Sequence, residues 1–320
     1  MLDAAQRFTV YPVQYDDIWQ MYKKQVAAFW TTEEVDYSRD REQFNSSALN
    51  DNERHFIKSV LTFFAGTDTV VTLNLMNSFC KEVKPIEAQM AYTFQAAMEC
   101  THAESYSVMI ETFITDNAEK DALFGHLGDM RSVHMKVEWA KRWSLQDAPF
   151  ATRLVAWVIV EGLFFSGAFC SIYWIKQKNL LPGLTKSNEF IARDEGMHTE
   201  FGALLYSKMK AKLPQSDVHA MFREAVDIEK EFIVESIPCR MVGMNQQLMA
   251  QYIEYVADGL LGMLGYSAIF GSTNPFAFMD LLGMSSRVNF FEQRPSEYQR
   301  ADTAGNDKLN VDTELFVPDF

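Results

Sequence analysis

The sequence is poor in the residues that interrupt helices and in those that build covalent frameworks. Its 320 residues include only 9 Pro, 15 Gly and 4 Cys. The scarcity of Pro and Gly favours long, uninterrupted helices. No two cysteines have Cys-x-x-Cys spacing. This argues against a disulfide scaffold or a structural zinc site and suits a reducing, intracellular compartment.

Positive charge is also in short supply. Lys and Arg number 29 against 43 Asp and Glu, which gives a formal net charge of −14. A chain this acidic lacks the basic surface of a general nucleic-acid binder, so we expect no nucleic-acid partner. The N-terminal text MLDAAQRFTVYPVQYDD is polar and carries acids early, unlike a signal peptide. We therefore expect a cytoplasmic protein.

One segment has no basic residue over a length that could span a bilayer, Leu154 to Ile175. It contains Glu161, and a carboxylate at the centre of a membrane costs roughly 2.5–3.5 kcal/mol. A single acid does not exclude a transmembrane helix. The alternative, which we favour, is a helix that is apolar all round because it is buried in a large bundle, with no membrane contact.

The stretches between prolines are typical of helices, and no run of five or more residues alternates convincingly between apolar and polar. We expect an all-α chain with seven main helices: Asp51 toward Met76, Ile86–Ile114, Asp121–Trp143, Ala151–Lys176, Ser187–Lys210, Asp217–Ser236 and Gln246–Leu264. From Gln293 onward the text is polar and ends in an apolar cluster, Leu315–Val317 and Phe320. This end is either a frayed terminus or a mobile tail whose tip docks on a partner.

Two Glu-x-x-His motifs are the strongest chemical signal, Glu99-Cys-Thr-His102 and Glu195-Gly-Met-His198. Both lie in predicted helices, where positions i and i+3 share a face. Each has an upstream helix with a carboxylate among apolar residues, Asp68 and Glu161 respectively. A buried lone carboxylate is costly unless it is paired or bound to a metal.

Four helices that present these six side chains inward match the di-metal carboxylate bundle, in which two helices supply one carboxylate each and two supply Glu-x-x-His. Four carboxylates neutralise two divalent cations. Carboxylate oxygen with imidazole nitrogen suits iron or manganese. The competing interpretation is a set of unrelated acids with two surface histidines.

Tyr106 shares a helical face with Glu99 and His102, since a residue seven positions after Glu99 lies only 20° away from it around the helix. Phe165 and Phe169 continue the stripe that begins at Glu161. A tyrosine next to a metal pair and walled by phenylalanine would be shielded from solvent. Taken alone, a tyrosine on an inner helical face is more often ordinary core packing.

Several motifs carry a family resemblance over nearly the whole sequence: Phe29-Trp30 through Asp36, FFAGTD ending at Asp68, MECTHAESY, VEGLFFSGAF, SNEFIARDEGMH and NFFEQRPSEYQR. The protein resembles the small, radical-generating subunit of class I ribonucleotide reductase. Family members without metal replace carboxylate ligands, and those without a tyrosyl radical have Phe in place of Tyr106. This sequence keeps the carboxylate ligands and has Tyr at position 106.

The resemblance implies roles for individual residues. The six metal ligands would be Asp68, Glu99, His102, Glu161, Glu195 and His198. Tyr106 would become a stable radical after the reduced metals react with oxygen, inside an apolar pocket of Phe165, Phe169 and Ile191. Trp30 and Asp194 would form a relay from His102 toward the surface. Tyr298 would pass the oxidising equivalent to the large subunit, on which the extreme C-terminus would dock.

The resemblance also implies an all-α, ferritin-like bundle over residues 1–290 and a flexible C-terminal tail over residues 291–320. It implies a homodimer with two iron ions per chain, although the ligands alone do not choose iron over manganese or a mixed pair. The expected activity is that of ribonucleoside-diphosphate reductase. The alternatives are a ferritin-like di-metal oxidase or ligand-binding protein without a reductase partner, and an iron-storage bundle. The first would not need Trp30, Tyr298 and the apolar tip. The second would be recognised by cage assembly and mineral uptake, and it has no obvious use for Tyr106 in a Phe-lined pocket.

Overall fold

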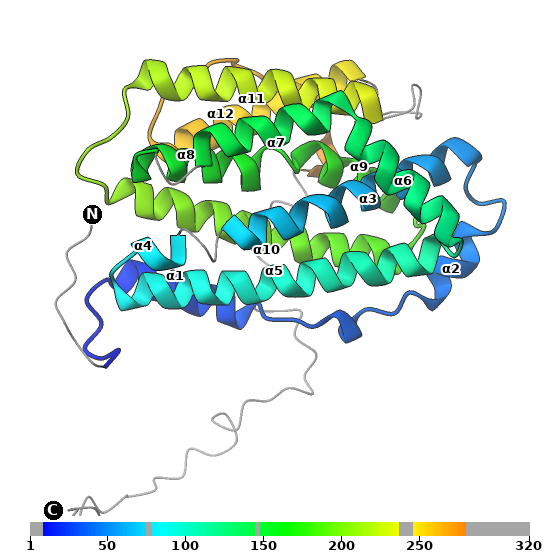
Figure 1. The fold of residues 1–320 in the computed structure, drawn as a ribbon, viewed down its shortest axis with the longest axis horizontal. Helices are drawn as coiled ribbons and strands as arrows, with labels where there is room; N and C mark the ends of the chain where they lie inside the picture. The colour runs from blue at the N-terminus through cyan, green and yellow to red at the C-terminus, as the bar shows by residue number, and fades with distance from the viewer. Residues whose placement is uncertain (1–8, 75–78, 145–147, 237–245, 280–320) are drawn as a thin grey trace, which may run out of the picture. The chain divides into compact units, whose positions relative to one another are not determined.

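The computed structural model describes residues 9–74, 79–144, 148–236 and 246–279, without the side chains of residues 67–74, 81, 144 and 236. Within these ranges the protein forms twelve α-helices and one short 3-10 helix, Thr32–Glu34, and no strand. The α-helices are α1 Asp16–Ala27, α2 Ser38–Phe44, α3 Asp51–Asn74, α4 Cys80–Glu82, α5 Ile86–Phe113, α6 Asn117–Asp129, α7 Arg131–Ser144, α8 Phe150–Gly162, α9 Ser166–Lys176, α10 Pro182–Ser207, α11 Gln215–Ser236 and α12 Gln246–Leu264 (Figure 1). The all-α prediction is confirmed.

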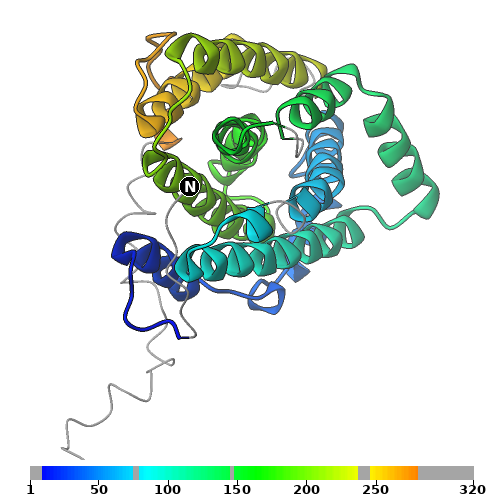
Figure 2. The ribbon, with the colours of Figure 1, turned by 60° about the vertical axis from the view of Figure 1, so that its left-hand side comes forward.

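The centre of the bundle is the consecutive pair α8 and α9. Figure 2 shows this pair enclosed by a ring of helices, and α8 packs on α10, α7, α12 and α11. Opposite this pair, α5 lies against α3 and α1. The long helices α3, α5, α8 and α10, which carry the predicted ligands, therefore meet in the interior.

The segment 150–176 is apolar and long enough to cross a membrane by length and composition alone. In the fold, 94% of its most apolar window is buried by other parts of the protein. The core-helix interpretation of this segment therefore accounts for its composition, and Glu161 lies inside the bundle.

The predicted single helix over residues 151–176 is wrong in one respect, because it breaks at residues 163–165. The N–H groups of Leu163 and Phe164 both donate to the carbonyl of Ile159, at 2.9 and 3.2 Å. Ser166 then donates to Leu163 at 3.0 Å. The helix thus widens and restarts, which places its two halves in different registers.

Other helix boundaries also differ from the prediction. The charged helix predicted over residues 121–143 is two helices, because the backbone turns at Met130 between α6 and α7. Helix α10 begins at Pro182 rather than at Ser187, and the carboxylate of Asp40 accepts from the N–H groups of Gly183 and Leu184 at its start. The sequence hid this cap because its acceptor lies more than 140 residues away.

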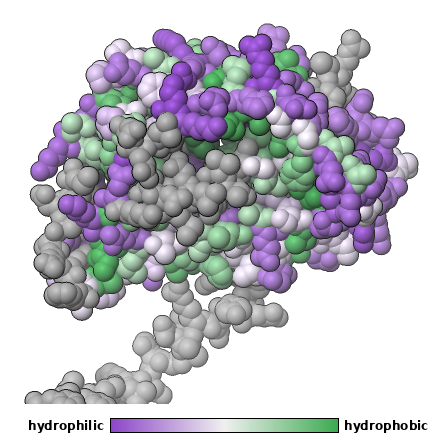
Figure 3. All heavy atoms as spheres, viewed as in Figure 1, coloured by the Kyte–Doolittle hydropathy of each residue, from purple (hydrophilic) through white to green (hydrophobic). Residues whose placement is uncertain are grey.

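Hydrophilic and apolar residues are unevenly distributed over the surface shown in Figure 3. On the face seen in Figure 3, hydrophilic residues gather along the upper edge, where α11 runs, with apolar residues between them elsewhere. The acidic residues that matter for chemistry are exceptions, since Glu99, Glu161, Glu195 and Asp194 are buried. The predicted boundary between residues 290 and 291 lies outside the described residues.

Candidate metal centre

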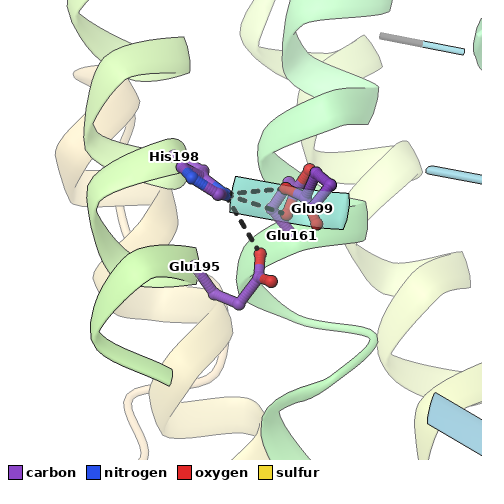
Figure 4. A group of neighbouring side chains, drawn as sticks. All are labelled: Glu99, Glu161, Glu195 and His198. Atoms are coloured by element: carbon purple, nitrogen blue, oxygen red, sulfur yellow. Dashed lines mark ion pairs between the residues drawn. The ribbon is translucent and has the colours of Figure 1, made fainter. Parts of the chain in front are cut away.

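Three carboxylates and a histidine from three helices converge in the core. Glu99 comes from α5, Glu161 from the last turn of α8, and Glu195 and His198 from α10 (Figure 4). One ligand atom from each of the four lies within 4.8 Å of the others, and all four residues are buried. The two Glu-x-x-His motifs thus meet, as their spacing predicts.

His102 completes the cluster in a way that pairs it with His198. Glu99 places Oε2 at 3.3 Å from Nδ1 of His102 and Oε1 at 2.9 Å from Nδ1 of His198. Glu195 does the same, with Oε1 at 3.1 Å from His102 and Oε2 at 3.5 Å from His198. In each of these carboxylates, therefore, one oxygen faces His102 and the other faces His198.

The far side of His102 is held by a second set of polar groups. Its Nε2 lies 3.2 Å from Oδ2 of Asp194, and the same oxygen accepts a hydrogen bond of 2.7 Å from the indole N–H of Trp30. The Trp30 and His102 rings are stacked, with centroids 6.2 Å apart. Trp30, Asp194 and His102 thus form a continuous buried relay.

Two residues that sequence reasoning missed support this relay. The Arg193 guanidinium donates to Oδ1 of Asp194 at 2.9 Å and to the carbonyl of Ala28 at 2.6 Å. Phe190 packs on Trp30 with ring centroids 5.0 Å apart. Both belong to the SNEFIARDEGMH motif, and their place next to Asp194 was the available signal.

The carboxylates control the protonation of both imidazoles. Burial lowers the pKa of His198, but Glu99 and Glu195 outweigh burial and raise it to about 9. Burial likewise opposes protonation of His102, yet Asp194, Glu195 and Glu99 raise its pKa well above 6.5. Burial raises the pKa of Glu195, but its contacts with Glu161, His102 and His198 lower it overall. Without a metal, protons on the histidines balance the buried acids.

The donor set fits metal ions. Both oxygens of Glu99 and the Nδ1 atoms of His102 and His198 are buried without a hydrogen bond of ordinary geometry. Buried polar atoms in that state are expensive unless something else satisfies them. Because Asp194 holds Nε2 of His102, Nδ1 is left to face the cluster, which is the arrangement of a ligating histidine with a carboxylate behind it.

Tyr106 is buried on α5, and its ring stacks on Phe64 with centroids 4.8 Å apart and planes 6° from parallel. Phe64 in turn contacts Phe165 and Phe169, at 5.9 and 4.9 Å between centroids. The apolar wall beside Tyr106 therefore begins with Phe64, which sequence reasoning did not name. Its position four residues before Asp68 places both on one face of α3 and was the available signal.

The remaining predicted site residues divide into two groups. Ile191 is buried on α10. The backbone of Asp68 lies in α3, but its side chain is outside the described residues, as are Tyr298 and the whole predicted tail. Five of the six predicted ligands are thus seen together.

A helical bundle with carboxylates and paired histidines in its core defines the ferritin-like, di-metal carboxylate class. The profile of the family "Ribonucleotide reductase, small chain" matches residues 7–275. The protein belongs to the ribonucleotide reductase small-chain family.

Comparisons with individual proteins agree. The sequence is 50% identical over 295 residues to a ribonucleoside-diphosphate reductase small subunit of Arabidopsis thaliana, covering 92% of this protein and 89% of that one. It is 48% identical to a Plasmodium falciparum relative of the same name, over 96% of this protein and 87% of that one. The solved structure of the Rnr4 homodimer from Saccharomyces cerevisiae matches with a TM-score of 0.81 at 33% identity, covering 89% of this protein and 90% of that one.

These findings favour a reductase subunit over the di-metal oxidase without a reductase partner. The protein is a small subunit of ribonucleoside-diphosphate reductase, an oxidoreductase that works with a large subunit.

Proposed function

We propose that the cluster holds two iron ions per subunit and that oxygen activation there converts Tyr106 into a stable radical for use by the large subunit. The observation that carries this proposal is that Glu99 and Glu195 both lie between the two histidines of the cluster. Each has one oxygen directed to His102 and the other to His198. Two carboxylates placed in this way, together with the two imidazoles, would hold a pair of cations.

The two bound iron ions would supply the oxidising power of ferrous iron with molecular oxygen. The protein positions the ligands, supplies the negative charge that balances the metal ions and keeps water out of the site. Glu161 and, from α3, Asp68 would complete the ligand set, bringing four carboxylates to two divalent cations. The same donors accept manganese, so the metal is decided by the test below. Helices, rather than loops, fix these side chains, which favours a precise site.

Tyr106 is suited to keep an unpaired electron because its surroundings exclude water and reductants. Its ring is 2% exposed and lies flat against Phe64. Phe165 and Phe169 pack in turn against Phe64, which adds to the apolar surroundings on that side. Its place on the Glu99 and His102 face of α5 puts it beside the metal ligands.

The relay Trp30–Asp194–His102 provides an exit path. When Trp30 gives an electron to the oxidised centre on the His102 side, which is thereby reduced, its indole proton can pass to Oδ2 of Asp194, which accepts the hydrogen bond from Nε1. Arg193 holds the other oxygen of Asp194, so the receiving oxygen keeps its orientation. From Trp30 the path would continue to Tyr298, and the residues 315–320 would dock on the large subunit.

The tail proposal has its own test. Deleting residues 315–320 should weaken association with the large subunit and leave iron binding and the Tyr106 radical unchanged. Tyr298→Phe should do the reverse, with normal association and no turnover, because Phe cannot be oxidised at a comparable potential. A truncated protein that assembles and turns over like the parent would sink the docking role.

The assembly and location are proposed on analogy and composition. The Saccharomyces cerevisiae relative is described as a homodimer, and a 33% identical protein with the same fold favours the same state here. Cys80, Cys100 and Cys170 are free thiols, which suits a cytoplasmic protein.

Electron paramagnetic resonance tests the central proposal. Metal-free protein given ferrous iron and oxygen should bind about two irons per subunit and develop a tyrosyl signal. Two irons are expected because Glu99 and Glu195 each face both histidines. Tyr106→Phe should keep the iron and lose the signal and the reductase activity. Retained activity in that variant would show ordinary core packing or a metal-based oxidant. Manganese loading in parallel, with its own cofactor spectrum and activity, decides between the metals.

A further inference from the structure

The break between α8 and α9 lies inside the core, where unsatisfied main-chain groups are costly. A helix end leaves carbonyl groups without partners, and a helix start leaves N–H groups without partners. Here both ends occur within a few buried residues, and Phe164 and Gly167 belong to them. Water does not reach these groups, so side chains must satisfy them.

One ion pair serves both groups. The Lys136 ammonium donates to the carbonyl of Phe164 at 2.7 Å and lies 2.5 Å from Oε2 of Glu229. The other oxygen of Glu229 accepts from the N–H of Gly167 at 3.3 Å. Lys136 comes from α7 and Glu229 from α11, so two flanking helices reach the break from outside.

The polarity of this arrangement suits the helix termini. A cation stands at the C-terminal end of α8, and an anion stands at the N-terminal end of α9. Each charge therefore lies where the helix dipole favours it. Reversing the two charges would keep their mutual attraction and oppose both dipoles.

The surroundings make the pair a poor source of stability by itself. Lys136 is 4% exposed and Glu229 is fully buried, and the ammonium lies 3.7 Å from the ring centroid of Phe232 and 4.4 Å from that of Phe63. Burial lowers the pKa of Lys136 to about 8 and raises that of Glu229 to about 7. An apolar pair of the same volume is often as stable as a buried ion pair, so the two main-chain contacts are its distinguishing feature.

The packing around the break is tight enough to transmit position. A Cβ atom on Gly167 would lie 2.5 Å from Cδ1 of Ile233 and 2.9 Å from Oε1 of Glu229. The start of α9 is therefore pressed directly against α11. Glu161 sits one turn before Phe164, and Phe165 lies between the two clasped residues.

We propose that Lys136 and Glu229 are positioning residues that clasp the α8–α9 break, and so set where Glu161 enters the metal cluster and where Phe165 stands beside Phe64. The inference rests on the proposed function of that cluster. It assigns no chemistry to the pair itself.

The test replaces both members together, so that no buried charge is left alone. Lys136→Met with Glu229→Met should fold, while the exposed pair Arg142 and Glu224, which joins the same two helices, is changed to Met as the matched control. In metal-free protein, the amides of residues 163–168 should exchange with deuterium at least about tenfold faster than in the parent. Affinity for ferrous iron should fall relative to the parent, and the electron paramagnetic resonance line shape of the Tyr106 signal should change.

A charge-reversed variant, Lys136→Glu with Glu229→Lys, separates clasping from simple helix pairing. It should resemble the double-Met variant, because each charge then faces the wrong main-chain group. Parent-like exchange, iron affinity and line shape in the double-Met variant would overturn the inference, as would full rescue by charge reversal. A parent protein that fails to bind iron would instead contradict the proposed function, while amide exchange still tests the clasp.

Discussion

The two histidines of the metal centre occupy the same motif and yet have different surroundings. His102 and His198 each follow a glutamate by three residues, and each directs Nδ1 toward Glu99 and Glu195. Behind His102 stand Asp194 and then Trp30. Among the described residues, no carboxylate is found behind His198 in the same way.

The difference separates two tasks within one site. The inner halves of the two histidines are equivalent, which suits the binding of two similar cations. The outer halves are not. Among the described residues, His102 alone is joined to a series, Asp194 and Trp30, through which an electron can reach the centre as the oxidising equivalent leaves. Metal binding should therefore depend on both histidines. Export of the oxidising equivalent should depend only on the side of His102, Asp194 and Trp30.

The largest expected effect comes from cutting the export path without touching the metal. Trp30→Phe keeps an aromatic ring against Phe190 and removes the N–H that Asp194 accepts. Iron content should match the parent, and reductase turnover with the large subunit should be lost. Trp157→Phe, at another buried tryptophan, is the control and should turn over normally. Normal turnover in Trp30→Phe would remove the functional asymmetry between the two histidines.

Removing either imidazole should weaken metal binding to a similar degree. His102→Ala and His198→Ala each delete one nitrogen ligand and leave Glu99 and Glu195 without that partner. We expect iron content to fall well below two per subunit in both, measured by metal analysis after equilibrium dialysis. Full occupancy in either variant would show that its histidine is not a ligand.

A smaller effect should follow from Asp194→Asn, which keeps the shape behind His102 and removes the charge. Loss of a carboxylate behind a ligating histidine typically costs 10–100-fold in metal affinity, so affinity should fall by about that factor. Glu200→Gln, at a half-exposed acid on the same helix, should leave affinity unchanged. Equal behaviour of the two variants would mean that the contact between Asp194 and His102 does not tune the metal.

How much the sequence could predict depends on the distance between interacting residues. The Glu-x-x-His spacing, the inward acids and the Tyr106 face follow from helical periodicity. The structure brings Glu99, Glu161, Glu195 and His198 together and buries Tyr106. The cap on α10 and the Lys136–Glu229 pair could not be predicted, because each joins residues far apart in the sequence. Helical periodicity predicts which face of a helix is buried, but it does not predict which residues of other helices pack against that face.

The break in the central helix was missed for a related reason. Residues 151–176 contain no proline, and Gly162 is tolerated inside a helix, so propensity predicts continuity. The groups that stabilise the break come from outside it, on Lys136 and Glu229. Similarly, the spacing of Phe64 from Asp68 could place it on the inner face of α3, but its stacking on Tyr106 is visible only in the assembled core.

The last expected effect is a pH dependence that the two histidines should share. The pKa of His198 in the metal-free protein is raised to about 9, and that of His102 well above 6.5, by carboxylates that outweigh burial. Both imidazoles are then protonated near neutral pH, and a metal ion must displace both protons. Each displaced proton makes affinity fall about tenfold per pH unit of acidification. For the metal-free fold the sign is opposite, because the raised pKa values stabilise it fully below about pH 6.5. That stability is lost as pH rises through the pKa of each histidine in the folded protein, which for His198 is about 9. Acid should therefore favour the metal-free protein and mild alkali the loaded one.

Binding titrations in two buffers of different ionisation enthalpy would count the protons released. A pH-independent affinity between about pH 6 and 8 would mean that the histidines are already neutral before metal binds, and that the balance of charge in the empty site is not the one described here.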